Sequence, residues 1–234
     1  MAKIISNKAI AQDTYLMEVQ GKYKGDMGQF YMVRSWSFFP LLSRPISIHE
    51  INSDSISFLY RVVGEGTKQL SQLKNGDELH LEGPFGKGFP KLKGKIAIVG
   101  GGIGVAPLYF AAKEYSNNKE VEELDIYLGF REEGLRVEAF KKLLSEVQVK
   151  IGGNVTELIE PDKYDHIITC GPDIMMQAVY EKAKATSAKV YVSIEKHMAC
   201  GIGACLVCTC ETKNGNKKAC KDGPVFLGEE VYYG

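Results

Sequence analysis

Residues 96–107 have the sequence IAIVGGGIGVAP, in which a short apolar run is followed by a glycine-rich turn and an apolar helical pattern. This order predicts a buried strand, a tight turn and a helix whose N-terminal amides can bind a phosphate. The turn differs from the G-x-G-x-x-G pattern, and a purely structural turn is the alternative. Its position between a strand and a helix favours a nucleotide site at Gly101, Gly102 and Gly104.

Strands and helices alternate after this stretch. The expected strands are 124–130, one around Val155, 166–170 and 189–195, and the expected helices are 107–115, 136–144 and 174–185. Such alternation is typical of a doubly wound parallel sheet, whose ligands bind beyond the carboxyl ends of the strands. Cys170, Gly171 and Pro172 end one of these strands, so we assign them to the nucleotide site. The alternative is a buried cysteine followed by an ordinary turn.

The N-terminal part of the chain has a different character. Short alternating runs occur at 4–11, 14–19, 29–35, 55–63 and 77–83, with turn residues between them and one brief helix expected at 66–73. Regularly spaced strands of this kind predict a small antiparallel β-barrel. We therefore expect a barrel domain over 1–93, an α/β domain over 94–195 and a small C-terminal domain over 196–234.

Three segments of the expected barrel have residues suited to a flavin. An arginine offers a fork of donors to a pyrophosphate, a serine hydroxyl can bond a ring nitrogen, and an aromatic side chain can cover a ring. A glycine turn that opens a helix can present amides to phosphate. Each segment alone is compatible with an ordinary strand or turn, but together they predict an FAD site. Its candidate residues are Arg44, Pro45, Ile46, Ser47, Leu59, Tyr60, Arg61, Gly66 and Thr67.

Four cysteines near the C-terminus have the spacing C-x4-C-x2-C-x11-C, which is the plant-type pattern of a [2Fe–2S] cluster. They are Cys200, Cys205, Cys208 and Cys220. Gly201 and Gly203 allow positive φ angles and leave amide groups free to point at sulfur atoms. The alternative is a zinc site, although zinc ligands usually come as two C-x-x-C-like pairs. Cys210 is the only nearby rival to the fourth ligand, and we expect it to pack beside the cluster.

Composition excludes several classes of function. The 234 residues contain 29 basic and 29 acidic side chains with no dense basic run, which argues against nucleic-acid binding. No apolar stretch approaches the roughly 20 residues needed to span a bilayer. Reduced thiols and the lack of an apolar signal core point to the cytoplasm. No constellation for acid–base or nucleophilic catalysis stands out, and Arg131, Glu132 and Glu133 leave the choice between NAD and NADP open.

The motifs RPIS, GEGT, GGGIGVAP and CGPDIMM, in this order, resemble those of the ferredoxin–NADP reductase superfamily. That resemblance implies FAD on a six-stranded antiparallel barrel and a nicotinamide nucleotide on the following α/β domain. The C-terminal run from His197 to Phe226 is similar to electron-transfer subunits of NAD-dependent (class 1B) dihydroorotate dehydrogenase.

The resemblance implies an oxidoreductase subunit of pyrimidine (UMP) biosynthesis. Electrons would pass from FMN in a separate catalytic subunit through the [2Fe–2S] cluster and FAD to NAD⁺, in a heterotetramer with two copies of each subunit. A small subunit of another flavin and iron–sulfur complex, such as a ferredoxin:NADP⁺ oxidoreductase or a sulfhydrogenase, is the main alternative. A non-catalytic protein with a zinc-stabilised tail is another.

Overall fold

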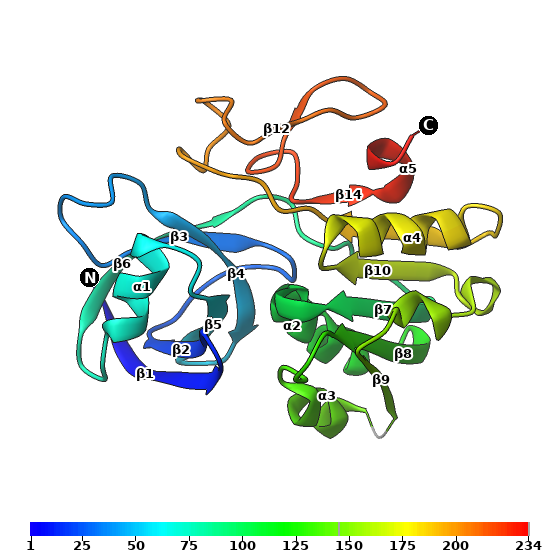
Figure 1. Ribbon diagram of the computed structural model, residues 1–234, viewed down its shortest axis with the longest axis horizontal. Coiled ribbons are helices and arrows are strands. Elements are labelled where there is room, and N and C mark those ends of the chain that lie inside the picture. Colours follow the sequence, from blue (N-terminus) through cyan, green and yellow to red (C-terminus); the bar gives the residue numbers. More distant parts are fainter. Residues whose placement is uncertain (145, 234) are drawn as a thin grey trace.

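The computed structural model describes residues 1–144 and 146–233. Its N-terminal part is a closed barrel of six antiparallel strands in the order β1-β2-β5-β4-β3-β6 (Figure 1). The strands are β1 Ala2–Ala11, β2 Thr14–Gln20, β3 Phe30–Arg34, β4 Arg44–Ile51, β5 Ser55–Arg61 and β6 Glu78–Phe85, with helix α1 Glu65–Gln72 between the last two. Ile4, Met17 and Phe58 are almost fully buried. The predicted barrel and its brief helix are confirmed.

The second part is a six-stranded sheet in the order β14-β11-β10-β7-β8-β9. Its strands are β7 Gly94–Gly101, β8 Val121–Phe130, β9 Val147–Ile151, β10 His166–Cys170, β11 Lys189–Ser193 and β14 Val225–Leu227. The first five of these are parallel, and β14 runs antiparallel to β11. The predicted parallel sheet is confirmed, with an antiparallel edge strand that the sequence did not predict.

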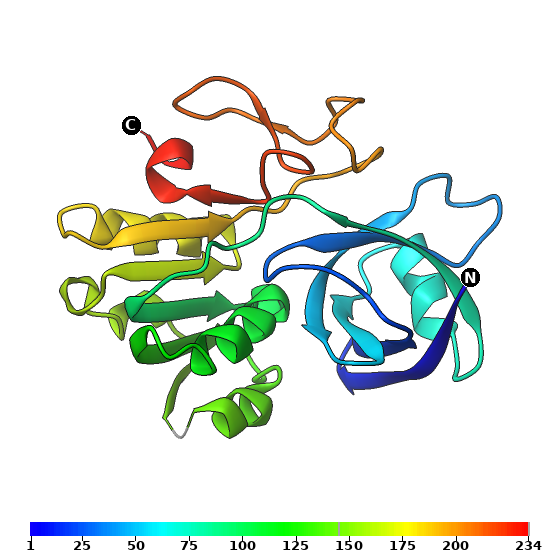
Figure 2. The same ribbon diagram turned by 180° about the vertical axis from the view of Figure 1, so that it is seen from behind.

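Helices cover both faces of this sheet. Helices α2 Val105–Ser116 and α3 Val137–Leu143 lie on one face and α4 Asp173–Ala183 on the other, as Figures 1 and 2 show from opposite sides. Side chains of β7 alternate accordingly, because successive residues of a strand point to opposite faces. Ile96 and Ile98 belong to the core under α2, whereas Ala97 and Val99 belong to the core under α4.

The prediction of a strand around Val155 is wrong. The strand is β9, Val147–Ile151, in which apolar and polar residues alternate, and Val155–Glu157 form the short 3₁₀ helix η2. The amide of Thr156 donates to the Asn154 side chain at 3.3 Å, which favours a helical turn over a strand.

The C-terminal segment leaves the sheet after β11 and returns to it. It forms a small hairpin of β12 Thr209–Cys210 and β13 Lys217–Lys218, then β14 and helix α5 Gly228–Val231. Ser193 of β11 lies opposite Val225 of β14, so the segment is closed at its base by strand pairing. The domain boundary at 195/196 stays a prediction. Strand β14 lies beyond this boundary in the sequence, but it pairs with the sheet of the α/β domain.

The remaining short elements are the 3₁₀ helices η1 Gly102–Gly104 and η3 Pro161–Lys163. In the part of the chain that the structure describes, no helix is long and apolar enough to cross a bilayer.

Candidate functional site

The cluster loop, residues 199–210, curls sharply around its cysteines. Gly201 and Gly203 have positive φ angles of 72° and 81°, as expected from the sequence, and both lie in the left-handed region that glycine favours. The amide of Gly203 consequently points at the thiol of Cys220, with 3.1 Å between nitrogen and sulfur. Amides aimed at sulfur stabilise a thiolate and tune a cluster bound to it.

The four predicted ligand thiols form two pairs. The amide of Cys205 donates to Cys200 Sγ at 3.4 Å, and the two thiols are within hydrogen-bonding reach of each other. The amide of Cys220 donates to Cys208 Sγ at 3.4 Å, and these thiols are also within reach. Among residues 1–144 and 146–233, no group of three or more His, Cys, Asp or Glu side chains is arranged to hold a single metal ion. Two pairs of thiols fit a two-iron cluster ligated by four cysteines.

The two pairs differ in their electrostatics. The amide of Cys205, together with those of Ile202 and Ala204, lowers the pKa of the Cys200 thiol to about 6. Burial, together with the neighbouring Cys208, raises the pKa of the Cys220 thiol to about 12. The Cys200 thiol is therefore more readily deprotonated than the Cys220 thiol, and the deprotonated thiolate is the form that binds metal.

Cys210 has a separate partner. Its thiol donates to the carbonyl of Lys217 at 3.4 Å, across the hairpin in which these two residues lie opposite each other. Only 6% of the residue is exposed, and burial raises its pKa. The geometry therefore gives Cys210 a packing role, whereas Cys220 faces Cys208.

The flavin candidates Arg44 and Gly66 lie together. The Arg44 guanidinium stacks over the indole of Trp36, 5.5 Å from its centroid. A Cβ at Gly66 would come within 2.5 Å of Arg44 Nε and 2.9 Å of Trp36 Cη2. Glycine is therefore required for Arg44 to approach the first turn of α1. Free helix amides beside a guanidinium fit the pyrophosphate of FAD.

Thr67 fixes the turn that leads into α1. Its hydroxyl accepts the amides of Val63 and Gly64 at 2.9 and 3.2 Å and donates to the Gly64 carbonyl at 3.0 Å. The side chain is thus occupied by its own turn, which positions the amides behind it.

The aromatic residue of segment 59–61 lies in the barrel core, whereas the sequence suggested that it covers the flavin ring. Leu59 and Tyr60 are buried, and the Tyr60 hydroxyl donates to Asn7 Oδ1 at 3.1 Å, while Arg61 is exposed. The aromatic ring beside Arg44 is that of Trp36, which the sequence analysis missed. Trp36 is the only tryptophan of the chain, but it lies in an irregular loop without a motif.

Pro45, Ile46 and Ser47 follow Arg44 along β4 and are partly exposed. In the pairing of β4 with β3, Pro45 lies opposite Met32 and Ser47 opposite Phe30.

The nucleotide candidates come together at the carboxyl ends of β7 and β10. A Cβ at Gly104 would come within 2.3 Å of the Cys170 carbonyl, and one at Gly101 within 3.0 Å of Pro172 Cδ. A Cβ at Gly171 would lie 2.9 Å from the Gly101 carbonyl. The two turns can approach this closely only because these positions lack side chains.

Gly102 differs from its neighbours. It has a φ angle of 54°, and within the described structure no atom lies within 4 Å of its Cβ position. Its backbone therefore borders open space beside the start of α2, as a phosphate site requires. The thiol of Cys170 lies at the same edge and is hydrogen-bonded to the Ser193 side chain. Burial raises the pKa of this thiol to about 12. That thiol is neutral at physiological pH.

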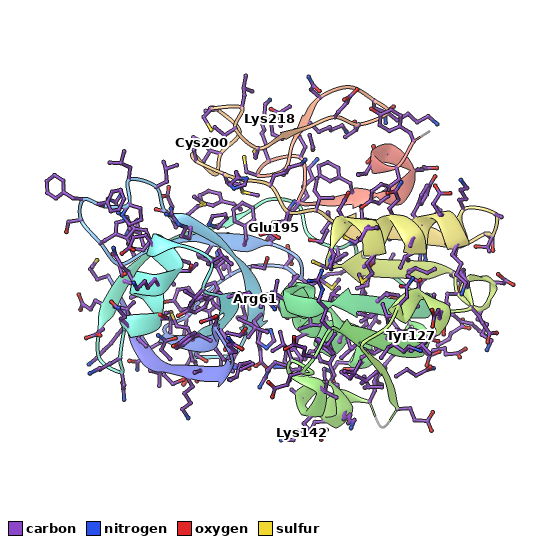
Figure 3. All side chains as sticks on the ribbon, in the orientation of Figure 1. Arg61, Tyr127, Lys142, Glu195, Cys200 and Lys218 are labelled. Atoms are coloured by element: carbon purple, nitrogen blue, oxygen red, sulfur yellow. The ribbon has the colours of Figure 1, made fainter. Side chains whose placement is uncertain are left out.

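The three candidate sites lie on neighbouring elements. A Cβ at Gly201 would come within 3.1 Å of Met32 Cγ, so the cluster loop packs on β3, next to the flavin strand β4. Strand β5 in turn contacts the glycine turn η1. Figure 3 shows Cys200 where the C-terminal segment passes the barrel, and Arg61 on the side of the barrel that faces α2.

Comparison with known proteins identifies the C-terminal segment and the chain as a whole. Residues 195–232 match the family described as the iron–sulfur cluster binding domain of dihydroorotate dehydrogenase B. The chain is 45% identical to the dihydroorotate dehydrogenase B (NAD(+)) electron transfer subunit of Clostridium acetobutylicum, over 98% of this chain and 95% of that protein. Identity to the Clostridium perfringens subunit is 42%, over 99% and 97% of the two chains.

Solved structures agree with this fold. A structure of the NADH-dependent reduced ferredoxin-NADP oxidoreductase superimposes with a TM-score of 0.86 at 29% identity, covering 100% of this chain and 90% of that one. A ferredoxin NADP⁺ reductase from Neisseria gonorrhoeae shares the fold, with a TM-score of 0.63 at 13% identity over 82% and 98% of the chains.

Proposed function

The chain belongs to the electron transfer subunits of NAD(+)-dependent dihydroorotate dehydrogenase B. We propose that its residues carry electrons from a catalytic subunit to NAD⁺. The chain is an oxidoreductase subunit that uses an iron–sulfur cluster and FAD. Its reaction belongs to pyrimidine biosynthesis. When bound, the cluster passes single electrons and FAD links these to hydride chemistry.

The packing of the cluster loop on the barrel carries this proposal. Gly201 contacts Met32 of β3, and Met32 lies opposite Pro45 of the flavin strand. Only one strand therefore separates the cluster loop from the residues proposed to bind FAD. The contact between β5 and η1 continues the same route to the nucleotide site.

We propose the following residues for each group. Cys200, Cys205, Cys208 and Cys220 ligate the cluster. Arg44 and Gly66 receive the FAD pyrophosphate, with Pro45, Ile46, Ser47, Leu59, Tyr60, Arg61 and Thr67 completing the flavin site. Gly101, Gly102, Gly104, Cys170, Gly171 and Pro172 form the NAD site.

We further propose that the catalytic partner contains FMN and binds over the cluster loop, in a heterotetramer of two copies of each subunit. Residues 198–210 contain no charged side chain. Ile202, Leu206 and Val207 are nevertheless 54–60% exposed. An uncharged surface with exposed aliphatic side chains beside a redox centre is suited to a protein partner. The free cysteines of the described chain are consistent with a cytoplasmic location.

Reconstitution with the catalytic subunit tests the proposal. The anaerobically purified chain should be coloured, contain iron and FAD, and support NAD⁺ reduction by dihydroorotate only when the partner is present. A colourless, iron-free chain would instead indicate the zinc-stabilised alternative. A coloured chain that never yields orotate with its partner would contradict the assignment to dihydroorotate oxidation.

A further inference from the structure

His49 is a buried histidine outside all three candidate sites. It lies on β4 two residues after Ser47, and none of its surface is exposed. Its Nδ1 is 2.8 Å from the carbonyl oxygen of Ala106, and its Nε2 is 3.3 Å from Arg136 Nε. Arginine can only donate, so Nε2 must accept and Nδ1 must carry the hydrogen that is donated to Ala106. The contacts thus define one neutral tautomer.

Aromatic stacking holds this arrangement. Tyr109 stacks on the His49 ring with 4.7 Å between centroids, and the Arg136 guanidinium lies 5.2 Å from the centroid of the Tyr109 ring. Phe140 packs edge-on against Tyr109 at 5.3 Å. We call His49, Ala106, Tyr109 and Arg136 the barrel–sheet bridge, because they join β4 to α2 and to the start of α3.

Each end of the bridge is attached to a proposed binding segment. His49 shares its strand with the flavin residues, and Ala106 follows the glycine turn of the nucleotide site by two residues. Arg136 ends the loop after β8, at the carboxyl edge of the sheet where nucleotides bind. Figure 1 shows the start of α2 against the barrel at this junction.

Arg136 has a backbone conformation that requires support. Its φ angle is 59°, in the left-handed region, and it is the residue before the first turn of α3. A residue other than glycine is strained in this region and persists there only when its surroundings hold it. The hydrogen bond to His49 and the stacking on Tyr109 supply those contacts.

A second, independent contact joins the same elements. Lys113 Nζ lies 2.6 Å from Glu50 Oε1 and 3.1 Å from Asn52 Oδ1, one helical turn beyond Tyr109. We therefore expect the barrel and the sheet to remain attached when the Arg136 contact is lost, with the angle between the flavin and nucleotide segments less constrained.

We propose that Arg136 and His49 are positioning residues for hydride transfer. They set the nucleotide site against the flavin site through the bridge, and neither belongs to the residues proposed to contact FAD or NAD. The inference rests on the proposed function. Reacting atoms must meet at about 3–3.5 Å, and a displacement of about 1 Å can cost about 100-fold in rate.

The test measures the reduction of bound FAD by saturating NADH in the full holoprotein, with stopped-flow absorbance. Arg136→Ala should slow this step at least about 10-fold, while flavin content, iron content and the KM for NADH stay near those of the unchanged chain. Arg136→Lys should recover most of the rate, because its ammonium can still donate to Nε2. Lys113→Ala is the matched control and should change the rate less than about 3-fold.

His49→Asn provides a second variant, which keeps a donor for Ala106 but loses the acceptor for Arg136. It should slow flavin reduction as Arg136→Ala does, and the double variant should be no slower than either. An unchanged rate in Arg136→Ala, an equal loss in Lys113→Ala, a change in KM alone or loss of flavin would each overturn the bridge. Unchanged holoprotein whose FAD is not reduced by NADH would overturn the proposed function instead.

Discussion

Gly66 is the residue at which the flavin site is most sensitive to a single methyl group. In Gly66→Ala the new Cβ would overlap Arg44 Nε, at 2.5 Å, and displace the guanidinium from the first turn of α1. We expect FAD to bind at least about 10-fold more weakly, a loss of about 1.4 kcal/mol. Fluorescence titration of the deflavinated protein measures this affinity.

Gly64→Ala is the matched control for that change. Gly64 has an extended backbone with φ of −179°, and no atom lies within 4 Å of its Cβ position. FAD affinity in Gly64→Ala should remain close to that of the unchanged chain. Equal affinities in the two variants would remove Gly66 from the flavin site.

The fourth cluster ligand is also decided at single residues. The sequence spacing left Cys210 as a rival to Cys220, and the structure engages the Cys210 thiol with the Lys217 carbonyl. Cys210→Ala should therefore retain the iron content and visible spectrum, whereas Cys220→Ala should lose them. Loss of iron in the Cys210 variant would reverse the assignment.

His49 should make stability depend on pH. Burial, together with the nearby charge of Arg136, lowers its pKa from 6.5 to about 3. Tyr109, Glu50 and Lys113 are the other titratable groups at this junction. The unfolded chain therefore binds a proton between these values that the folded chain does not. Stability should fall as the pH decreases from about 6.5 towards 3, by up to about 1.4 kcal/mol per pH unit.

Denaturant titrations at pH 7, 6 and 5 measure this dependence. His49→Asn lacks the titrating ring, so its unfolding free energy should fall less over the same range. Equal losses in both proteins would assign the pH dependence to other groups.

At the scale of elements, the cluster loop stores backbone strain at Leu206. Its φ angle is 64°, in the left-handed region, and the residue is 60% exposed. This conformation costs a residue other than glycine about 1–2 kcal/mol of folding free energy. Leu206→Gly should raise stability by about 1 kcal/mol and weaken binding of the catalytic subunit about 10-fold. Thermal unfolding and titration with the partner measure the two effects.

Ile202→Gly serves as the comparison for Leu206. Ile202 is exposed to a similar extent, but its φ angle is negative, so no strain is relieved. This variant should lose both stability and partner affinity. A stability gain in both variants would show that the strain at Leu206 is not the cause.

Elements with a strong local pattern were predictable from the sequence, and those defined by distant contacts were not. The strand at 124–130 and the helix at 107–115 have periodic apolar residues over most of their lengths, and both are present. Val155 was misassigned because an isolated β-branched residue does not distinguish a strand from a capped turn. The pairing of β14 with β11 joins residues about 30 positions apart in the sequence. The approach of Trp36 to Arg44 involves an irregular loop that has no recognisable motif.

At the scale of the whole molecule, the proposed electron route has the cluster loop at one end and the proposed nucleotide site at the other. Cys205→Ala should remove the cluster and abolish NAD⁺ reduction by dihydroorotate in the complex. Reduction of FAD by NADH should continue at a similar rate, because its proposed residues belong to β4, β5, α1 and the sheet. Stopped-flow absorbance separates the two activities, and loss of both would place the cluster within the flavin–nucleotide half of the route.

The pairing of Ser193 with Val225 has a consequence for how the protein matures in the cell. The two strands hold the base of the segment from Ile194 to Pro224 together through backbone hydrogen bonds that involve no metal. Small zinc domains, in contrast, remain unfolded until their metal arrives. We therefore expect the barrel and sheet of this chain to fold before iron arrives. In that case metal delivery would follow folding, and a damaged cluster could be replaced without unfolding the protein.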